Sequence, residues 1–412
     1  MGTRYGLLGR KLGHSWSPRI HGLLGCEDYA LFEKEPEELE AFLRSDEFDA
    51  INVTIPYKID VMAYCDELTD AAKGVGSVNT IVRKDGKLIG HNTDTDGFEY
   101  TVRRSGISFE GKKVVVLGDG GASKAVVYAT RKMGAKEIII VDINGENNYE
   151  NIDRHYDAQI VINTTPVGMY PKNGEILVDP SHFTHCEGAV DIVYNPLRTA
   201  FMLKCKTLGI PCAGGLPMLV AQAKAAEEMF FDKKIDDSKV EEIYVTLAAE
   251  QENIALIGMP GCGKSTIGAI LAEITGREAI DIDACIVENE NMSIPEIFAK
   301  DGEDYFRYLE HYELEKIGKE SGKIIITGGG IVKNGRNHAL LAQNSRIYHI
   351  SRDTSLLPKD GRPISQSTDL AVLYAQRAPL YKKFRDVEVP NDGTPEECAN
   401  AIWSDFNENS RN

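Results

Sequence analysis

One segment of this chain of 412 residues has the residue types and spacing that bind phosphate groups. Residues 258–265, Gly-Met-Pro-Gly-Cys-Gly-Lys-Ser, fit the pattern G-x-x-x-x-G-K-[ST], between a predicted strand (253–257) and an amphipathic helix. That helix is expected to bury Ile267, Ile270, Leu271 and Ile274 on one face. Backbone N–H groups of such a loop and the helix N-terminus bind phosphate oxygens. Lys264 would reach the β- and γ-phosphates and Ser265 would bind Mg²⁺, so the pattern predicts a nucleotide site.

Further patterns follow this loop. Residues 279–283, Ala-Ile-Asp-Ile-Asp, read as a strand that carries Asp281 and Asp283 on the same face. Ser293 to Glu296 reads as a capping box that opens a helix. Then come G-E-x-x-F-R-x-x-E at 302–310, three glycines at 328–330, G-R-P at 361–363 and R-A-P-L-Y at 377–381.

Together these motifs resemble shikimate kinase over residues 252–405. The resemblance implies that Asp283 binds the substrate hydroxyls and acts as base, with Lys264 and Arg362 as the other catalytic residues. It also implies a shikimate carboxylate on Arg307 and Arg377, a ring lined by Gly328, Gly329 and Gly330, and Mg²⁺ near Ser265 and Asp281. ATP is expected on Gly258, Gly261, Cys262, Gly263, Lys264, Ser265, Thr266 and Arg362. The lid, about 352–368, is shorter than usual for the family, and Arg352 is not assigned as a substitute for a second lid arginine.

The N-terminal half has its own set of polar motifs. Ser17 is predicted to cap a helix with Pro18 at the first helical position, and the Ser15 hydroxyl beside this terminus suggests a carboxylate site. The motifs of this half are H-S-W-S-P at 14–18, N-V-T-I-P-Y-K at 52–58, G-S-V-N-T at 76–80, N-T-D at 92–94, N-T-T-P-V-G-M at 163–169 and G-G-L-P-M-L-V-A-Q at 214–222.

This set resembles shikimate dehydrogenase over residues 4 to about 245. The resemblance implies the catalytic pair Lys58 and Asp94, and substrate contacts from Ser15, Ser17, Thr54, Asn79, Asp94, Tyr194 and Gln222. Reduction of a ketone leaves an alkoxide, which a lysine ammonium stabilises and protonates while a carboxylate keeps the lysine charged.

A glycine turn after the strand 114–117 predicts a dinucleotide site. The expected contacts are Gly118, Gly120, Gly121, Ala122, Asp142, Asn163 and Thr164. Asp142 follows the second strand, where an acid hydrogen-bonds the ribose of NAD, whereas the family usually carries an Arg that receives the 2′-phosphate of NADP. We therefore predict NAD over NADP, with NADP binding through Lys124 or Arg154 as the alternative.

Strands that alternate with helices predict an α/β protein with parallel sheets to position these residues. We expect a dehydrogenase at 1–250, with a substrate domain (about 1–100 plus 218–250) and a Rossmann dinucleotide domain (about 101–217). A P-loop kinase at 251–412 follows. The predicted function is reduction of 3-dehydroshikimate to shikimate and its phosphorylation to shikimate 3-phosphate. The alternatives are a quinate/shikimate dehydrogenase with a tethered kinase, and a non-catalytic sensor of nucleotide and quinate-like ligands.

Composition limits the partners. Lys plus Arg number 46 against 63 Asp plus Glu, a net charge of −17, which disfavours nucleic acid and anionic membrane. The eight cysteines include no C-x-x-C pair, so we expect free thiols in the cytoplasm, not disulfides or zinc. We expect no signal peptide, no membrane span, small-molecule substrates and a possible homo-oligomer.

Overall fold

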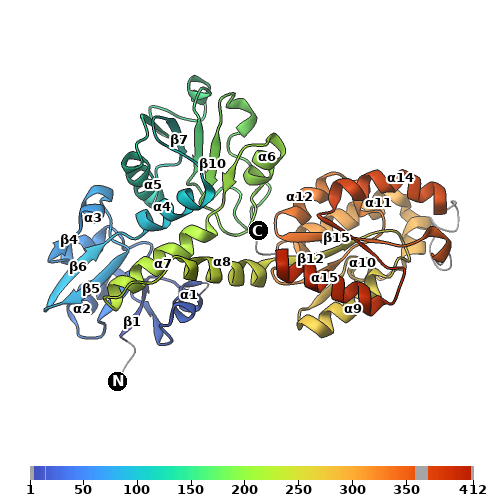
Figure 1. Cartoon of the computed structure of the whole chain (residues 1–412), viewed down its shortest axis with the longest axis horizontal. Coiled ribbons are helices and arrows are strands. Elements are labelled where there is room, and N and C mark those ends of the chain that lie inside the picture. The colour runs from blue at the N-terminus through green and yellow to red at the C-terminus, as the bar shows by residue number, and fades with distance from the viewer. Residues whose placement is uncertain (1–3, 14, 358–369, 410–412) are drawn as a thin grey trace. The chain divides into compact units, whose positions relative to one another are not determined.

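The computed structural model describes residues 4–13, 15–357 and 370–409 (Figure 1). The chain forms two compact units. The first comprises residues 1–169, 175–194 and 204–244, and the second comprises residues 170–174, 195–203 and 245–412. Each unit is built on sheets flanked by helices, which confirms the predicted α/β class.

The first sheet has six strands in the order β2-β1-β3-β5-β6-β4, parallel except where β5 pairs with β3 and β6. Its elements are β1 (Tyr5–Gly9), α1 (Ser17–Leu24), β2 (Tyr29–Glu33), η1 (Pro36–Glu38), α2 (Leu39–Arg44), β3 (Ala50–Val53), η2 (Asp60–Tyr64), β4 (Glu67–Leu68), α3 (Asp70–Val75), β5 (Thr80–Lys84) and β6 (Lys87–His91). Two helices far apart in sequence, α1 and α7 (Leu216–Phe230), pack together beside this sheet.

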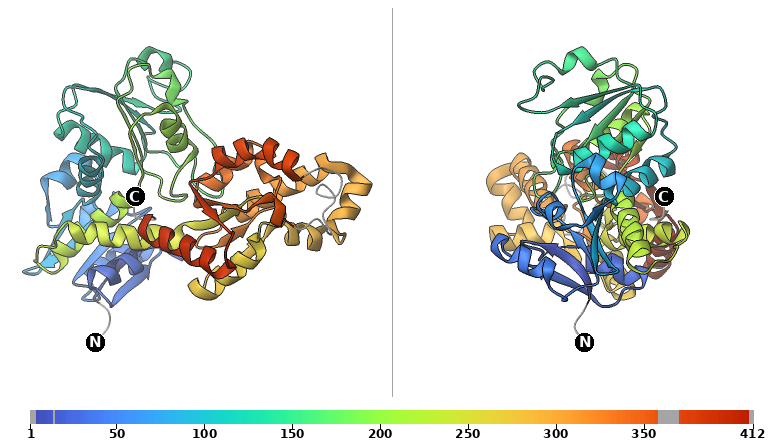
Figure 2. Two further views of the ribbon diagram at one scale, coloured as in Figure 1. Left: turned by 45° about the vertical axis from the view of Figure 1, so that its right-hand side comes forward. Right: turned by 90° about the vertical axis from the view of Figure 1, so that its left-hand side faces the viewer.

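The second sheet is fully parallel, in the order β11-β10-β9-β7-β8, and appears in green and teal in Figure 2. Its elements are α4 (Asp94–Ser105), β7 (Lys113–Leu117), α5 (Gly121–Lys132), β8 (Glu137–Val141), η3 (Ile152–His155), β9 (Ile160–Asn163), η4 (Pro180–His182), β10 (Gly188–Asp191), α6 (Ala200–Leu208), β11 (Cys212–Ala213) and α8 (Ser238–Gln251). Leu117 pairs with both Val141 and Asn163, so the loops after β7, β8 and β9 leave the same edge of the sheet.

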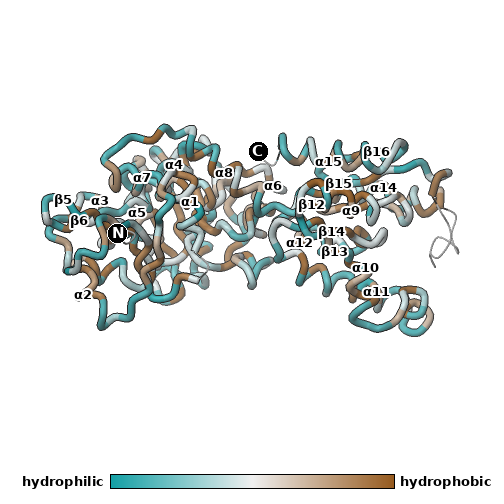
Figure 3. Tube along the Cα trace, turned by 90° about the horizontal axis from the view of Figure 1, so that it is seen from below, coloured by the Kyte–Doolittle hydropathy of each residue, from teal (hydrophilic) through white to brown (hydrophobic). Residues whose placement is uncertain are grey.

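The third sheet, in the second unit, is also parallel, in the order β13-β14-β12-β15-β16. Its elements are β12 (Asn253–Ile257), α9 (Lys264–Thr275), β13 (Ala279–Asp281), α10 (Ile282–Glu290), α11 (Ile294–Ile317), β14 (Ile324–Ile326), η5 (Ile331–Lys333), α12 (Arg336–Ala342), β15 (Ser345–Ser351), η6 (Thr354–Leu356), α14 (Leu370–Phe384), β16 (Val387–Pro390) and α15 (Pro395–Asn409). Hydrophobic stretches run along its inner strands (Figure 3). Every residue of β12 is buried, as expected for a strand covered on both faces.

Two local predictions were wrong. Ile274 is 41% exposed and does not share the buried face of α9, which consists of Lys264, Ile267, Gly268 and Leu271. The strand expected at 279–283 ends at Asp281, and Asp283 lies in the first turn of α10. The reason is local: the Asp281 side chain accepts hydrogen bonds from the backbone N–H groups of Asp283 and Ala284, which makes it a helix cap.

Candidate active sites

Lys58 and Asp94 form an ion pair in the first unit. Lys58 lies in the turn after β3, and Asp94 is the first residue of α4. Lys58 Nζ donates a hydrogen bond to Asp94 Oδ2 at 2.7 Å, and the two side chains are 25% and 13% exposed. The second oxygen, Oδ1, accepts a hydrogen bond from Asn79 Nδ2 at 2.9 Å. Because both oxygens are bonded, the carboxylate has a fixed orientation and holds the ammonium in place.

The pair lies in a cavity of ≈ 490 Å³. The seven residues of this half that were predicted to contact substrate line the cavity together with the predicted catalytic residue Lys58; the seven are Ser15, Ser17, Thr54, Asn79, Asp94, Tyr194 and Gln222. Sequence reasoning did not assign Lys11 and Trp16, which also line it. Trp16 packs edge-on against Tyr194, with ring centroids 6.1 Å apart. Trp16 could have been identified from the sequence, because it stands between two serines that were predicted to bind the carboxylate. No sequence motif marks Lys11 as a residue of the site.

The serine segment differs from its predicted geometry. Ser17 is the first residue of α1 and its N-cap is Trp16, so the prediction that Ser17 caps this helix was wrong. The Ser15 hydroxyl accepts a hydrogen bond from the Ser17 backbone N–H at 3.2 Å and so takes over part of the capping role. This leaves the Ser17 hydroxyl at the cavity wall beside a helix N-terminus, where an anion is favoured.

The loop after β7 has the geometry that a dinucleotide diphosphate requires. Gly118 has φ of 97°, and a Cβ there would lie 2.7 Å from the Thr165 side chain. Helix α5 starts at Gly121. Its N-cap residue is Gly120, which has no side chain, so no side chain caps the backbone N–H groups at this terminus. A Cβ on Gly120 or Gly121 would meet no atom within 4 Å. The uncapped helix terminus and the open space beside it fit a bound diphosphate.

The other predicted dinucleotide contacts differ in position. Thr164 Oγ1 donates to Leu117 O at 2.7 Å at the end of β7, while Ala122 lies in the first turn of α5. Asn163 is buried and its amide donates to Asp191 Oδ1 at 3.0 Å, so its side chain faces the interior of the sheet. Asp142 directly follows β8.

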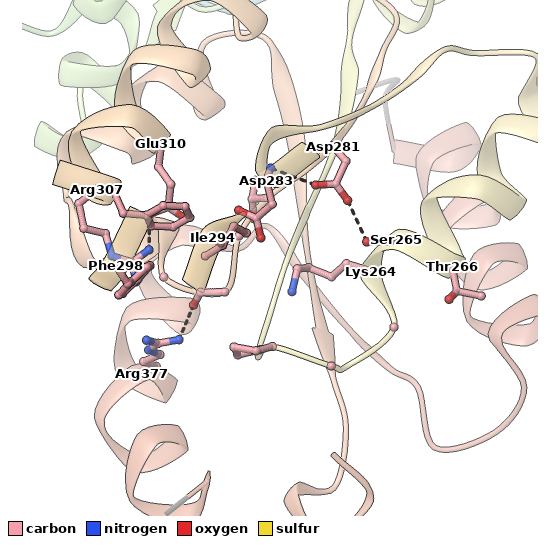
Figure 4. A pocket seen from close by; sticks show the side chains of 18 of the residues that line it. Lys264, Ser265, Thr266, Asp281, Asp283, Ile294, Phe298, Arg307, Glu310 and Arg377 are labelled. Atoms are coloured by element: carbon pink, nitrogen blue, oxygen red, sulfur yellow. Dashed lines mark hydrogen bonds and ion pairs between the residues drawn. The ribbon is translucent and has the colours of Figure 1, made fainter. Parts of the chain in front are cut away.

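In the second unit, the glycine-rich loop folds around its own lysine (Figure 4). Lys264 is 8% exposed, and its Nζ donates to the backbone oxygens of Gly258 at 2.9 Å and Met259 at 3.1 Å. Gly261 and Gly263 have φ of 83° and 103°, conformations that favour glycine. The N-terminus of α9 has no side-chain cap. The loop therefore leaves backbone N–H groups available for phosphate oxygens.

Ser265 and Asp281 lie side by side at the edge of this loop. Ser265 Oγ donates to Asp281 Oδ2 at 2.9 Å. A hydroxyl and a carboxylate at this spacing, next to a phosphate loop, fit the oxygen ligands that Mg²⁺ prefers. Within the described part of the chain, no cluster of three or more His, Cys, Asp or Glu residues could hold a metal on its own. A magnesium ion here would need the nucleotide's oxygens as well.

Two buried carboxyl groups face the glycines after β14. Burial, with the nearby charge of Asp281, raises the pKa of Asp283 to about 6, although Lys264 and Arg307 oppose the rise. Burial likewise raises the pKa of Glu310 to about 7. Asp283 Oδ1 and Glu310 Oε1 lie 2.6 Å and 2.3 Å from the position a Cβ on Gly328 would take.

Both oxygens, Asp283 Oδ1 and Glu310 Oε1, lack a hydrogen-bond partner within the described residues. They are therefore available to accept hydrogen bonds from the hydroxyl groups of a ligand. Sequence reasoning did not assign Glu310, although it is the last residue of the G-E-x-x-F-R-x-x-E motif.

Two arginines flank these carboxyl groups. Arg307 is paired with Glu310 and with Glu303, the latter at 2.9 Å. Arg377 Nη1 donates to Gly329 O at 2.9 Å. A Cβ on Gly330 would lie 2.2 Å from the Arg307 guanidinium, so this group occupies the space that a side chain at position 330 would take. A buried guanidinium, that of Arg377, and a half-buried one, that of Arg307, beside a cavity suit a planar carboxylate.

These residues surround a cavity of ≈ 430 Å³. The predicted residues that line it are Gly261, Gly263, Lys264, Ser265, Thr266, Asp281, Asp283, Arg307, Gly328, Gly329, Gly330 and Arg377. Cys262 is buried behind the loop, where its carbonyl accepts from Asn391 Nδ2 at 2.7 Å. Arg362 and most of the predicted lid lie outside the described residues. Arg352 lines the cavity.

The two halves of the chain match different protein families. The family described as "Shikimate dehydrogenase substrate binding domain" matches residues 7–81, and the family "Shikimate kinase" matches residues 260–407. A "Shikimate dehydrogenase (NADP(+))" of Clostridium beijerinckii is 38% identical over 259 residues, which are 58% of this chain and 96% of that protein. One from Clostridium perfringens is 37% identical over 264 residues, 59% of this chain and 97% of that protein.

Solved structures agree for the N-terminal part. A chorismate mutase/shikimate 5-dehydrogenase fusion protein from Clostridium acetobutylicum has a TM-score of 0.57 and 36% identity, over 60% of this chain and 97% of that chain. A quinate dehydrogenase from Corynebacterium glutamicum in complex with NAD has a TM-score of 0.54 and 26% identity, over 60% of this chain and 99% of that chain.

Proposed function

We propose, from the premise that this chain belongs to the shikimate dehydrogenase family and carries a fused shikimate kinase domain, that it catalyses two consecutive steps. In the proposed order, 3-dehydroshikimate is first reduced to shikimate by the part before about residue 250. Shikimate is then phosphorylated to shikimate 3-phosphate by the part after it. The observation that supports the proposal is that each half has a cavity whose lining residues suit a small carboxylate with hydroxyl groups. The hydroxyl that the first reaction makes at C3 is the one that the second reaction consumes.

In the dehydrogenase, Lys58 is the proposed proton donor. The nicotinamide supplies hydride to the ketone carbon when it is bound. The Lys58 ammonium then stabilises the developing alkoxide and gives it a proton, and the 2.7 Å contact with Asp94 holds the ammonium in place. Ser15 and Ser17 hold the carboxylate, while Thr54, Asn79, Tyr194 and Gln222 hold the ring. In the oxidative direction, Lys58 would remove the proton instead.

In the kinase, Asp283 is the proposed base for the attacking hydroxyl. ATP with Mg²⁺ supplies the phosphoryl group when bound. Lys264 and Arg362 would balance the charge that develops on it, and Ser265 and Asp281 would hold the metal. Arg307 and Arg377 would bind the substrate carboxylate. The unpartnered oxygen of Asp283 supports this role, because a base needs a free lone pair in the cavity.

The test is a coupled reaction on the purified chain. 3-Dehydroshikimate, reduced nicotinamide cofactor and Mg-ATP should yield shikimate 3-phosphate, and omission of ATP should stop the reaction at shikimate. Absence of both products would contradict the proposal. Quinate is the substrate to test beside shikimate, because one similar structure is a quinate dehydrogenase. A catalytic efficiency for quinate above that for shikimate would favour a quinate/shikimate dehydrogenase with a tethered kinase. Turnover in either half would exclude a purely sensory role.

We infer that the dehydrogenase prefers NAD over NADP. Asp142 directly follows β8, where a carboxylate hydrogen-bonds a ribose 2′-hydroxyl and repels a 2′-phosphate. Ile143 beside it is 75% exposed and brings no positive charge. The names of relatives such as that from Clostridium beijerinckii specify NADP(+), which argues the other way, whereas the similar quinate dehydrogenase structure holds NAD. Lys124 lines a small hollow with Asp119 and Arg131, and Lys124 or Arg154 is the candidate cation if NADP binds instead.

The cofactor preference is decided by catalytic efficiency with shikimate and each cofactor. A charge-assisted hydrogen bond contributes about 1.5–3 kcal/mol, so we expect at least roughly a tenfold preference for NAD. Asp142→Asn combined with Ile143→Arg should move the preference toward NADP, and Lys124→Ala should leave it unchanged. A wild-type preference for NADP would refute the inference, and loss of that preference in Lys124→Ala would identify Lys124 as the cation that binds the 2′-phosphate. We also propose the cytoplasm as the compartment, which the eight free cysteines support.

A further inference from the structure

One arginine of the kinase cavity has no role in the reaction proposed above. Arg352 directly follows β15 and lines the cavity of ≈ 430 Å³. The residue is half-buried, and its Nε is buried without a hydrogen-bond partner within the described residues. A guanidinium stays charged at neutral pH, and a buried donor without an acceptor is costly. An anion in the cavity would give this side chain the counter-charge that it lacks.

The strand order places Arg352 beside the phosphate loop. In the parallel order β14-β12-β15, the phosphate loop after β12 lies between the segments that follow its two neighbours. The glycines at 328–330 follow β14 on one side, and Arg352 follows β15 on the other. A Cβ on Gly258 would lie 2.5 Å from Ile350 O, so the loop begins against the end of β15. Arg352 therefore approaches the loop from the side opposite to the three glycines.

The backbone on both sides of Arg352 is anchored to the loop that follows β16. Ser351 O accepts a hydrogen bond from the backbone N–H of Asn391 at 2.8 Å. The backbone N–H of Asp353 donates to Asp392 Oδ1 at 3.2 Å. The Asn391 side-chain amide in turn donates to a carbonyl oxygen of the phosphate loop at 2.7 Å. The backbone of Arg352 thus has a fixed place relative to the phosphate loop, whereas its Nε has no partner within the described residues.

The other cationic side chains that line the cavity within the described residues already have partners. The Lys264 ammonium donates to two backbone oxygens of the phosphate loop. Arg307 pairs with two glutamates, and Arg377 donates to a backbone oxygen of the glycine segment after β14. Arg307 and Arg377 therefore belong to the end of the cavity that is proposed to bind shikimate. Arg352 is the cation of the cavity on the far side of the phosphate loop.

The acidic residues of the cavity lie at the shikimate end as well. Asp281 is the last residue of β13, the edge strand beyond β14, and its carboxylate accepts from Ser265 Oγ at 2.9 Å. Asp283 is in the first turn of the helix that follows, and Glu310 is paired with Arg307. Because these carboxyl groups are on the β13–β14 side, they leave the charge of a guanidinium after β15 for a ligand.

We propose that Arg352 binds the β- and γ-phosphates of the nucleotide, from the side of the phosphate loop opposite to the shikimate end. Lys264, which is expected at the same phosphates, has its Nζ 2.9 Å from Gly258 O, at the residue that abuts the end of β15. An arginine offers two parallel N–H donors, which match two phosphate oxygens. The inference rests on the proposed function, because it takes this cavity as the ATP site of the kinase.

The first test removes the charge and keeps an unbranched side chain. Arg352→Met should raise both the Kd and the KM for Mg-ATP about ten- to a hundredfold, the effect of one charge-assisted hydrogen bond. The shikimate KM of the kinase at saturating Mg-ATP should stay near wild type, which reports a folded site. Arg352→Lys keeps the charge without the planar fork, so its values should lie between those of wild type and Arg352→Met.

Arg336→Met is the matched control. Arg336 is the exposed first residue of α12 and does not line the cavity, so its loss should change neither KM. A Kd and a KM for Mg-ATP that are the same in Arg352→Met and in wild type would overturn the proposal. An equal rise of both values in Arg336→Met and Arg352→Met would do so too, because it would trace the effect to the charge of the protein and not to a contact.

The second test identifies the part of the nucleotide that Arg352 contacts. Inorganic tripolyphosphate should inhibit the wild-type kinase in competition with ATP, and Arg352→Met should weaken this inhibition by the same factor as it weakens ATP binding. Inhibition by adenosine should not change. Loss of adenosine inhibition with retained tripolyphosphate inhibition would place Arg352 at the base. A rise in the shikimate KM without a rise in the ATP KM would place it at the substrate carboxylate, and either result refutes the assignment to the phosphates.

Direct binding of Mg-ATP to the full chain separates this inference from the proposed function. A wild-type chain that binds Mg-ATP but does not phosphorylate shikimate rejects the proposed kinase reaction, and the comparison of Kd values between wild type and Arg352→Met still decides the role of Arg352. An active wild type whose Arg352→Met variant binds Mg-ATP normally rejects only the present inference. A wild-type chain that binds no Mg-ATP rejects both.

Discussion

At the scale of single residues, Asp283 and Glu310 carry the most informative electrostatics of the kinase site. Their raised pKa values, about 6 and about 7, result mainly from burial. Both carboxyl groups lie next to Gly328, so their titrations are linked. The pKa values that an activity assay reports therefore belong to the pair and not to either residue alone. A base that is protonated cannot accept the proton of the attacking hydroxyl, so the two groups connect pH directly to catalysis.

We predict that kinase kcat/KM for shikimate falls as the pH drops from 8 through about 6, because the free enzyme then binds a proton at the carboxyl pair. Dehydrogenase activity, measured on the same samples, should not follow this curve. Asp283→Asn should remove most kinase activity together with the pH dependence. A kinase profile that stays flat between pH 5 and 8 would contradict the assignment of Asp283 as base.

Stability should show the opposite sign. A carboxyl group whose pKa is raised by folding binds its proton more tightly in the folded state, so its contribution to stability is lost as the pH rises through the folded value. Asp283→Asn should therefore stabilise the protein against urea by roughly 1 to 3 kcal/mol at pH 8 and have little effect at pH 4. If Asp283→Asn loses kinase activity and gains stability, the Asp283 carboxylate is needed for catalysis although it lowers the free energy of unfolding.

Many residue-level expectations followed from motifs, and the exceptions have a common physical cause. Lys58 and Asp94 stand in short motifs whose order is visible in the sequence, and the fold brings them to 2.7 Å. The buried side chains of His21 and Glu227 lie 2.8 Å apart, but the two residues are separated by 206 positions and belong to no motif. Their pairing depends on how α1 packs on α7, which no local pattern encodes.

At the scale of secondary structure, the strands were the most predictable elements. The runs at 114–117, 160–162 and 254–257 are apolar, and they lie in β7, β9 and β12 in the interior of their sheets. Element ends were less predictable, because side chains compete for backbone groups there. Asp281 is the clearest example, since its capping bonds end β13 and place Asp283 on a helix.

The packing of α4 on α7 depends on one small residue. A Cβ on Gly97 would lie 2.5 Å from Met218 O and 3.0 Å from Gln222 Cβ. Gly97→Ala should push α7 away, displace the Gln222 side chain from the substrate cavity, and raise the shikimate KM of the dehydrogenase. It should also destabilise the first unit by about 1–3 kcal/mol.

A second glycine serves as control for that experiment. Gly22 lies within α1, where a Cβ would meet no atom within 4 Å. Gly22→Ala should leave both activities unchanged and should slightly stabilise the protein, because alanine has the higher helix propensity. Thermal unfolding and dehydrogenase kinetics of the two variants decide the matter. If both variants change stability and the shikimate KM equally, close packing at Gly97 does not position Gln222.

At the scale of the whole molecule, the two cavities are lined by residues of different units. No helix in the described part of the chain is long and apolar enough to cross a membrane. We predict that Lys58→Ala abolishes dehydrogenase activity and leaves kinase kinetics near wild type, and that Lys264→Ala does the reverse. Both activities should be assayed separately on each variant, with circular dichroism to confirm folding. Loss of both activities in a folded single variant would contradict two independent sites.

The same separation bears on how shikimate passes from one reaction to the next. Shikimate is small, and among the described residues each cavity is lined only by residues of its own unit. We therefore expect shikimate to leave the first cavity and reach the second by diffusion. Labelled 3-dehydroshikimate, given with reduced cofactor, Mg-ATP and a pool of unlabelled shikimate, should yield shikimate 3-phosphate whose label is diluted in proportion to that pool. A mixture of Lys58→Ala and Lys264→Ala chains at equal concentrations of each active site should show the same lag and final rate as the wild type. Undiluted label in the product, or a mixture that is slower than the wild type, would show that the intermediate is transferred within one molecule.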